Sequence, residues 1–138
     1  MRFDLDTIKN ELKSKFNLHD HCSSQSSICL IAELNDMILG YICCTRDMDI
    51  YQLMDVFVAS EVRGQGIGSA LVNYTRSVIG DDASMEAMLE MDDAGSIAFL
   101  KSCGFSVVNV LEGDVLLLRV GCRFRHAPEI AYRITKES

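Results

Sequence analysis

Residues 53–72, LMDVFVASEVRGQGIGSALV, carry the strongest structural pattern of this chain, because a β-rich run, a glycine loop and a helical pattern follow one another. The loop has glycines at positions 64, 66 and 68, directly after Arg63. Beyond it, apolar residues recur at the spacing of an amphipathic helix that ends near Gly80. That apolar face consists of Ile67, Ala70, Leu71, Tyr74 and Val78. A glycine loop before a helix N-terminus predicts an anion site, since unpaired amides and the helix dipole converge there.

Three kinds of phosphate-binding loop compete for this stretch, and the spacing of its residues separates them. An ATP-binding Walker loop requires Gly-Lys-Ser or Gly-Lys-Thr, but Ser69 follows Gly68 and no lysine occurs between Arg46 and Lys101. A dinucleotide-binding fingerprint requires a third glycine where Ser69 stands. The remaining pattern is Arg-x-x-Gly-x-Gly between a strand and a helix, in which glycines let backbone amides approach an anion closely.

The chain before the loop predicts one helix and an antiparallel run of strands. Asp6 is a plausible N-cap for a helix at residues 6–16, and a polar gap follows at 17–27. A hairpin is expected to turn at NDM (35–37). Across the whole chain, the expected strands occupy residues 28–34, 37–44, 50–59, 85–91, 105–111 and 114–120.

The chain after the loop predicts a second helix and a closing hairpin. The helix covers residues 92–105, with an aspartate cap at its start and Gly104 at its end. The hairpin turns at the two residues Glu112 and Gly113. The segment after Val120 leaves two alternatives open, a short helix that begins at Pro128 or an edge strand in IAYRIT (130–135).

Composition indicates a single domain over all 138 residues, with a basic C-terminal segment at 121–138. The net charge of −7 argues against binding of nucleic acid. No apolar run is long enough to span a bilayer and no signal-peptide core is visible, so we expect a cytoplasmic protein without membrane partners. The six cysteines form no CxxC pair and no zinc-site spacing, so we expect no metal and mostly apolar core packing for them.

With these elements in place, the sequence resembles the GNAT superfamily of N-acetyltransferases. The resemblance rests on residues 53–72 together with AFLKSCGF (98–105), and Arg63, Gly66 and Gly68 match the superfamily's loop. It implies an α+β fold with a mixed, largely antiparallel β-sheet and helices packed on both faces. Within the superfamily, the sequence resembles the diamine acetyltransferases, whose corresponding strand reads Leu-Glu-Asp before two aromatic residues and a valine.

The resemblance also implies acetyl-CoA as the acyl donor and an amine as the acceptor, on a small molecule or a protein. Backbone groups of Val56, Phe57 and Val58 would pair with the pantetheine arm of the donor, and amides of the loop would hold its pyrophosphate. The loop residues carried over in this way are Arg63, Gly64, Gln65, Gly66, Ile67, Gly68 and Ser69. A homodimer is a further expectation that the resemblance alone supports.

Acyl transfer to an amine requires a base, because a free aliphatic amine is protonated near neutral pH. Asp55 is the one carboxylate of the strand before the loop, and strand alternation would place it with Phe57, away from Met54 and Val56. A backbone amide near Val56 or Phe57 is the expected donor to the thioester oxygen. The diamine enzymes carry a glutamate where Met54 stands, so recognition of polyamines is not implied.

A proton donor for the leaving thiolate is harder to identify. Many members of the superfamily have a tyrosine five residues before the aromatic of the Gly-Phe pair, and Leu100 occupies that position. Tyr41, Tyr51 and Cys103 are the alternatives that the sequence offers, beside an unassisted or water-assisted departure of the thiolate.

In the superfamily, two helices before the second strand help to form the acceptor pocket, whereas only 27 residues precede Ile28 here. We therefore expect a more open acceptor groove, suited to a large or exposed amine. His19 and His21 are expected in a solvent-exposed loop. Two other functions stay open: an acyl-CoA-binding or protein-interaction module without catalysis, and a nucleotide-binding protein of another family.

Overall fold

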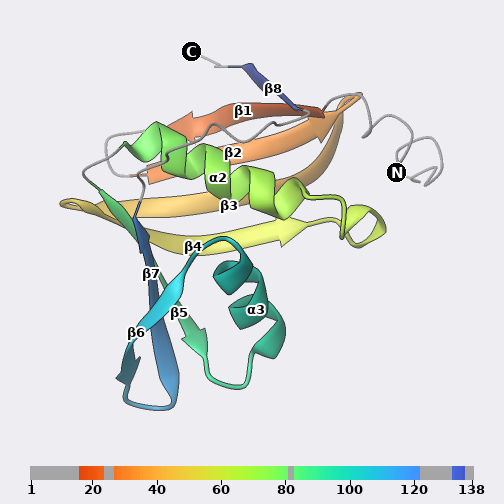
Figure 1. Cartoon of the computed structure of the whole chain (residues 1–138). Coiled ribbons are helices and arrows are strands. Elements are labelled where there is room, and N and C mark those ends of the chain that lie inside the picture. The colour runs from red at the N-terminus through yellow and green to blue at the C-terminus, as the bar shows by residue number, and fades with distance from the viewer. Residues whose placement is uncertain (1–15, 24–26, 81–82, 122–131, 136–138) are drawn as a thin grey trace.

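The computed structural model describes residues 16–23, 27–80, 83–121 and 132–135, which build one eight-stranded sheet and two α-helices. Figure 1 shows the helices lying against this sheet, whose strand order is β6-β7-β5-β4-β3-β2-β1-β8. The strands are β1 Phe16–Ser23, β2 Ser27–Leu34, β3 Met37–Asp47, β4 Ile50–Val58, β5 Ser84–Glu90, β6 Ser106–Leu111, β7 Val115–Gly121 and β8 Tyr132–Thr135. The helices are α2 Ile67–Ile79 and α3 Ala94–Ser102, with a short 3-10 turn η1 at Ser60–Val62.

The predicted α+β class with a mixed, largely antiparallel sheet is confirmed. All neighbouring strands pair antiparallel except β4 with β5 and β1 with β8. The six strands expected from the sequence correspond to β2–β7, and the expected helices after the loop correspond to α2 and α3. The helix expected at 6–16 lies outside the described residues, apart from Phe16, which begins β1.

The prediction of a polar gap at 17–27, with both histidines in a loop, was wrong. Residues 16–23 form β1, which pairs antiparallel with β2 and parallel with β8. In FNLHDHCS (16–23) the apolar residues Phe16, Leu18 and Cys22 alternate with polar ones, but Asp20 interrupts the pattern, so the local strand signal is weak. Pairing on both edges satisfies its backbone groups and outweighs the weak strand propensity of its polar residues.

The two hairpins turn differently from each other. The β2–β3 turn consists of Asn35 and Asp36, both at positive φ, which agrees with the expected turn because asparagine and aspartate tolerate that conformation. In the β6–β7 hairpin Leu111 pairs with Val115, so three residues form the loop instead of the predicted two. Beyond β7, the expected edge strand at 130–135 is found in its last four residues, because β8 covers Tyr132–Thr135, and the alternative helix start at Pro128 lies outside the described residues.

Helix α2 packs across β2, β3 and β4 and supplies the centre of the core. Four of its five predicted apolar positions are buried, whereas Val78 is 41% exposed. Val72 and Thr75 are fully buried instead, and the Thr75 hydroxyl donates to the Leu71 carbonyl at 2.7 Å. This internal bond satisfies the Thr75 hydroxyl, since an unpaired polar group is costly in the core.

Strands β4 and β5 pair over only three residues before they diverge. The pairs join Ile50–Gln52 to Ser84–Glu86, and beyond them the arm of β5, β7 and β6 turns away from the rest of the sheet (Figure 1). Parallel strands that separate in this way leave unpaired backbone groups on both facing edges. The sheet is therefore split into two arms with a gap between them.

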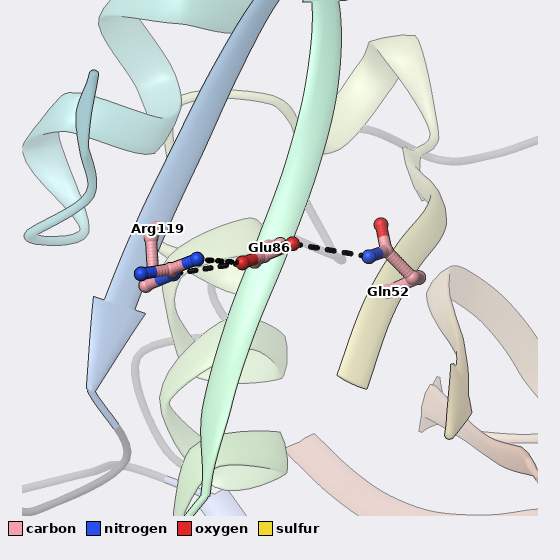
Figure 2. A network of polar contacts seen from close by, with 3 residues as sticks. All are labelled: Gln52, Glu86 and Arg119. Atoms are coloured by element: carbon pink, nitrogen blue, oxygen red, sulfur yellow. Dashed lines mark hydrogen bonds and ion pairs between the residues drawn. The ribbon is translucent and has the colours of Figure 1, made fainter. Parts of the chain in front are cut away.

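A polar network closes the junction of the two arms (Figure 2). Glu86 on β5 is buried, and its carboxylate accepts from the Gln52 amide on β4 at 3.1 Å and from the Arg119 guanidinium on β7 at 2.7 Å. A second Arg119 nitrogen also contacts the same Glu86 oxygen. The buried carboxylate is thus paired on both sides, as a charge away from water has to be.

The cysteines only partly follow the expectation of core packing. Cys44 and Cys103 are buried, Cys29 and Cys43 are half-buried, and no disulfide joins cysteines within the described ranges. Neither α2 nor α3 is long and apolar enough to span a membrane, and these are the α-helices of the described chain.

Candidate functional site

A cleft of about 780 Å³ opens where the two arms of the sheet diverge. Residues Leu53–Val58 of β4, here called the β4 wall, line one side. Residues Ala87–Leu89 of β5, here called the β5 wall, line the other. The lining is completed by Arg63, Gly64, Gly66, Ile67, Gly68 and Ser69 of the loop and α2, and by Asp93, Gly95, Ser96, Phe99 and Leu100 around α3. Both walls begin directly after the last paired residues, Gln52 and Glu86.

The three loop glycines have two different structural roles. Gly64 and Gly66 adopt φ of 80° and 84°, a region that side-chain-bearing residues rarely enter, and a Cβ on either would meet no atom within 4 Å. Gly68 has no positive φ, but a Cβ there would lie 3.0 Å from the Phe99 ring. The first two glycines therefore shape an open concavity, and the third lets α2 pack closely against α3.

The N-terminus of α2 faces this concavity. Its N-cap is Gly66, no side chain caps it, and the first intrahelical bond runs from the Ala70 amide to the Gly66 carbonyl. Unpaired amides at a helix N-terminus carry a partial positive charge, so they favour an anionic group. Arg63 is held beside them by a 3.0 Å bond from its Nε to the Val58 carbonyl. Gln65 is exposed and does not line the cleft.

The β4 wall contains a β-bulge that the sequence did not reveal. Cys43 pairs with Asp55 and Cys44 with Leu53, so Met54 is the extra residue of β4. The expected strict alternation between Met54 and Asp55 was wrong, because the bulge leaves both residues exposed and both line the cleft. No described strand pairs with the β5-side edge of this wall, so its backbone groups on that edge face the cleft.

Asp55 is positioned by an aromatic residue from the neighbouring strand. The Tyr41 hydroxyl of β3 donates to Asp55 Oδ2 at 2.8 Å, and the Tyr41 ring stacks on Phe57 with centroids 5.5 Å apart. Asp55 and Phe57 therefore share one face, as strand alternation predicted. The hydrogen bond to Asp55 raises the pKa of Tyr41 above its usual value of 10.0, so the phenol stays protonated and continues to donate.

The β5 wall and α3 contribute residues that sequence reasoning did not place in a site. Ala87, Met88 and Leu89 offer no titratable group, and Met88 is 58% exposed. Asp93, predicted only as a helix cap, accepts from the Ser96 amide at 3.2 Å and also lines the cleft. The sequence predicts the capping role of Asp93. Its position in the cleft could not be predicted, because it depends on how β5 diverges from β4.

The three alternatives to a catalytic tyrosine at position 100 lie in different places. Leu100 itself lines the cleft and is buried against the core. Tyr51 and Arg46 line a separate, smaller pocket of about 260 Å³, and neither residue lines the cleft. Cys103 is buried at the end of α3, and burial raises the pKa of its thiol despite hydrogen bonds with Ser69 and Ser102. Tyr41 and Cys103 each contact a residue that lines the cleft, Asp55 and Ser69 respectively, and Tyr41 is the one that contacts the candidate base.

The cleft as a whole fits an elongated ligand with an anionic part. The open glycine concavity and the α2 N-terminus would receive the anion, and the unpaired β4 edge would hydrogen-bond an extended chain. The paired Tyr41 and Asp55 lie farther along the β4 wall, where a polar group of a second ligand would meet a carboxylate.

Comparisons with known proteins place this chain among acetyltransferases. A sequence profile of the Acetyltransferase (GNAT) family matches residues 3–105. An uncharacterised N-acetyltransferase of Methanocaldococcus jannaschii is 24% identical over 98 residues, which are 64% of this chain and 43% of the relative. The chain therefore spans less than half the length of that curated relative.

Two solved structures resemble the fold closely. A putative GNAT-family acetyltransferase from Desulfovibrio desulfuricans superposes with a TM-score of 0.67 at 20% identity, covering 86% of this chain and 78% of that protein. The PaiA N-acetyltransferase from Thermoplasma acidophilum, solved in complex with coenzyme A, superposes with a TM-score of 0.64 at 14% identity, covering 70% and 61%. At these identities the likeness supports the fold.

Proposed function

The chain belongs to the GNAT acetyltransferase family, and from that premise we propose that it transfers an acetyl group from acetyl-CoA to a primary amine of a small molecule or protein. The observation that carries the proposal is a single cleft with an anion cradle at one end and the Tyr41–Asp55 pair along its β4 wall. The two features match the two substrates of such a reaction, an anionic nucleotide-like donor and a cationic amine.

The donor end fits the diphosphate of coenzyme A, which the Thermoplasma relative binds. The amides of residues 64–69 would hold the diphosphate, because Gly64 and Gly66 leave the cradle open and the α2 N-terminus favours an anion. The backbone of Val56, Phe57 and Val58 would align the pantetheine arm. Arg63 ties the loop to the end of β4 through the Val58 carbonyl, so loop and wall keep a fixed spacing.

Acetyl-CoA supplies a thioester whose carbonyl carbon an amine can attack. Asp55, which is exposed in the cleft, would act as the base that accepts a proton from the ammonium form of the acceptor. The resulting neutral amine can then attack the thioester. Tyr41 would hold the Asp55 carboxylate in place through its 2.8 Å hydrogen bond. A backbone amide near Val56 or Phe57 would donate to the oxygen on which negative charge develops.

A non-catalytic acyl-CoA-binding module is the second candidate, and one observation favours it. Leu100 occupies the position of the usual acid and is 3% exposed, and its aliphatic side chain cannot donate a proton. The two candidates share the donor site and differ in turnover alone, so calorimetry with acetyl-CoA combined with a thiol-release assay on an amine panel separates them.

Replacing Asp55 with asparagine tests the catalytic proposal. We expect Asp55→Asn to lower kcat by about a hundredfold or more, the usual contribution of a general base, with an unchanged Kd for acetyl-CoA. The matched control is Asp92→Asn, because Asp92 is also exposed and lies in the turn before α3 without lining the cleft. Wild-type turnover in Asp55→Asn across the pH range would reject the assignment of Asp55 as base.

A further inference from the structure

Three cysteines and Asp55 occupy successive register positions across four neighbouring strands. Cys22 on β1 pairs with Cys29 on β2, Cys29 pairs with Cys43 on β3, and Cys43 pairs with Asp55 on β4. Directly opposed residues of antiparallel strands project to the same face of the sheet. In the sequence these cysteines are 7 to 14 residues apart and form no recognisable motif.

Cys29 and Cys43 have the placement that a disulfide requires. Directly opposed residues of an antiparallel pair have Cα atoms about 4.5–5.5 Å apart, and disulfides span Cα separations of about 4.4–6.8 Å. Both cysteines are half-buried, so a small reagent can reach the pair, whereas Cys44 and Cys103 are buried. The pair therefore combines proximity with access.

The electrostatic surroundings of Tyr41 agree with this placement. Tyr41 precedes Cys43 by two residues on β3, so their side chains share a face. After the dominant effect of Asp55, nearby Cys43 and Cys29 also contribute to raising the pKa of Tyr41. Both thiols therefore lie on the face that carries the Tyr41–Asp55 pair.

We propose that Cys29 and Cys43 form a redox-active dithiol that closes to a disulfide on contact with a low-molecular-weight disulfide. One cysteine, as thiolate, attacks the oxidant's disulfide and releases the first small thiol, leaving a mixed disulfide. The second cysteine then loses its proton and attacks the Sγ of the first cysteine in the mixed disulfide. The bond to the small molecule breaks, and the second small thiol is released. The two protein thiols are oxidised by two electrons, and the oxidant is reduced to two thiols.

Glutathione disulfide is a suitable probe, applied to the intact folded chain. We expect titration with a thiol reagent to lose two of the six thiols, and the protein mass to fall by the two lost hydrogens. Cleavage after Glu33 separates the peptide of Cys29 from that of Cys43, so the disulfide would join two peptides until dithiothreitol releases them. Fragmentation of the joined peptides identifies the linked residues.

Variants decide between this pair and its neighbours. Cys29→Ser and Cys43→Ser should each abolish the internal disulfide and retain a single glutathione adduct. Cys22→Ser and the buried-site control Cys44→Ala should still form the internal disulfide.

Far-UV circular dichroism of each variant confirms folding, and wild type in urea provides the unfolded reference. A disulfide between Cys22 and Cys29, or one that forms only in urea, would overturn the proposal, as would unchanged thiol counts in the folded protein. These outcomes are independent of whether the chain acetylates amines.

Discussion

The two walls of the cleft look alike in the sequence and differ in the structure. Both are short, mainly apolar segments of strands that pair in parallel as far as Gln52 and Glu86. The β4 wall carries an exposed carboxylate at Asp55 and a bulge at Met54, and it leads into the glycine cradle. The β5 wall presents only Ala87, Met88 and Leu89. The chemistry of the site therefore belongs to one wall, and the other supplies shape and an apolar surface.

The difference follows from what each wall is paired with. β4 is backed by β3, whose Tyr41 reaches Asp55 and Phe57. β5 is backed by β7, whose polar residue Arg119 is used at the junction, where it binds Glu86. Glu86 on β5 thus holds the arms together with Arg119 and with Gln52 of β4, whereas Asp55, farther along β4, is left for the cleft.

Separating the walls at their junction should have the largest effect. Arg119→Met would leave the Glu86 carboxylate, whose side chain is 7% exposed, with the neutral Gln52 amide alone. We expect a loss of about 2–3 kcal/mol in the free energy of unfolding, toward the low end for a broken buried ion pair. The reason for the low end is that 46% of the Arg119 side chain is exposed, so water reaches the pair. Urea unfolding measures the loss of free energy. In thermal unfolding, the same loss should lower Tm by about 5–10 °C.

A matched control shows whether the loss comes from the junction. Lys101→Met removes an exposed cation from the last turn of α3, where it does not contact Glu86, and should change stability by less than about 0.5 kcal/mol. Glu86→Gln should be milder than Arg119→Met, because an amide leaves no buried charge. Equal stability of Arg119→Met and wild type would show that the network does not hold the two arms together.

The donor end of the β4 wall is tested by comparing two glycines with similar positive φ, Gly66 and Gly113. Gly66→Val places a β-branched residue at φ 84°, and relaxing that strain distorts the cradle. We expect acetyl-CoA binding to weaken about tenfold to a hundredfold, the equivalent of about 1–3 kcal/mol. Gly113→Val imposes similar strain at φ 78° in the distant β6–β7 hairpin and should leave Kd unchanged. Calorimetry measures the Kd of both variants for acetyl-CoA. Equal losses of affinity would show that the loop glycines do not form the donor site.

The smallest effect is expected at alkaline pH, from the acceptor side of the same wall. Because the folded pKa of Tyr41 is raised, its contribution to stability is fully present below the unfolded value of about 10 and is lost as pH rises through the folded value. Urea unfolding between pH 8 and 11 should show stability falling above about pH 10. Asp55→Asn should reduce this fall and lower the pH at which Tyr41 absorbs as phenolate. An identical tyrosine titration in both proteins would contradict the coupling.

Local sequence patterns identified most of the fold. The alternating and helical patterns located β2–β7, α2 and α3, because each buries one face against the core and has turn or cap residues at its ends. They missed β1, since its strand conformation depends on pairing with β2 and β8. They also missed the third residue of the β6–β7 loop, because Glu112–Gly113 alone has the composition of a two-residue turn.

The sequence by itself determined the donor end of the site. The proposed recognition of the donor uses backbone amides, and glycines at positive φ let those amides approach an anion closely, so the requirement lies in consecutive residues. Only the tertiary structure decided the opposite features: the bulge at Met54, the Tyr41–Asp55 bond, the Glu86 junction and the opposed thiols of Cys29 and Cys43. Each joins side chains from different strands, and which residues meet depends on cross-strand register, which no local pattern encodes.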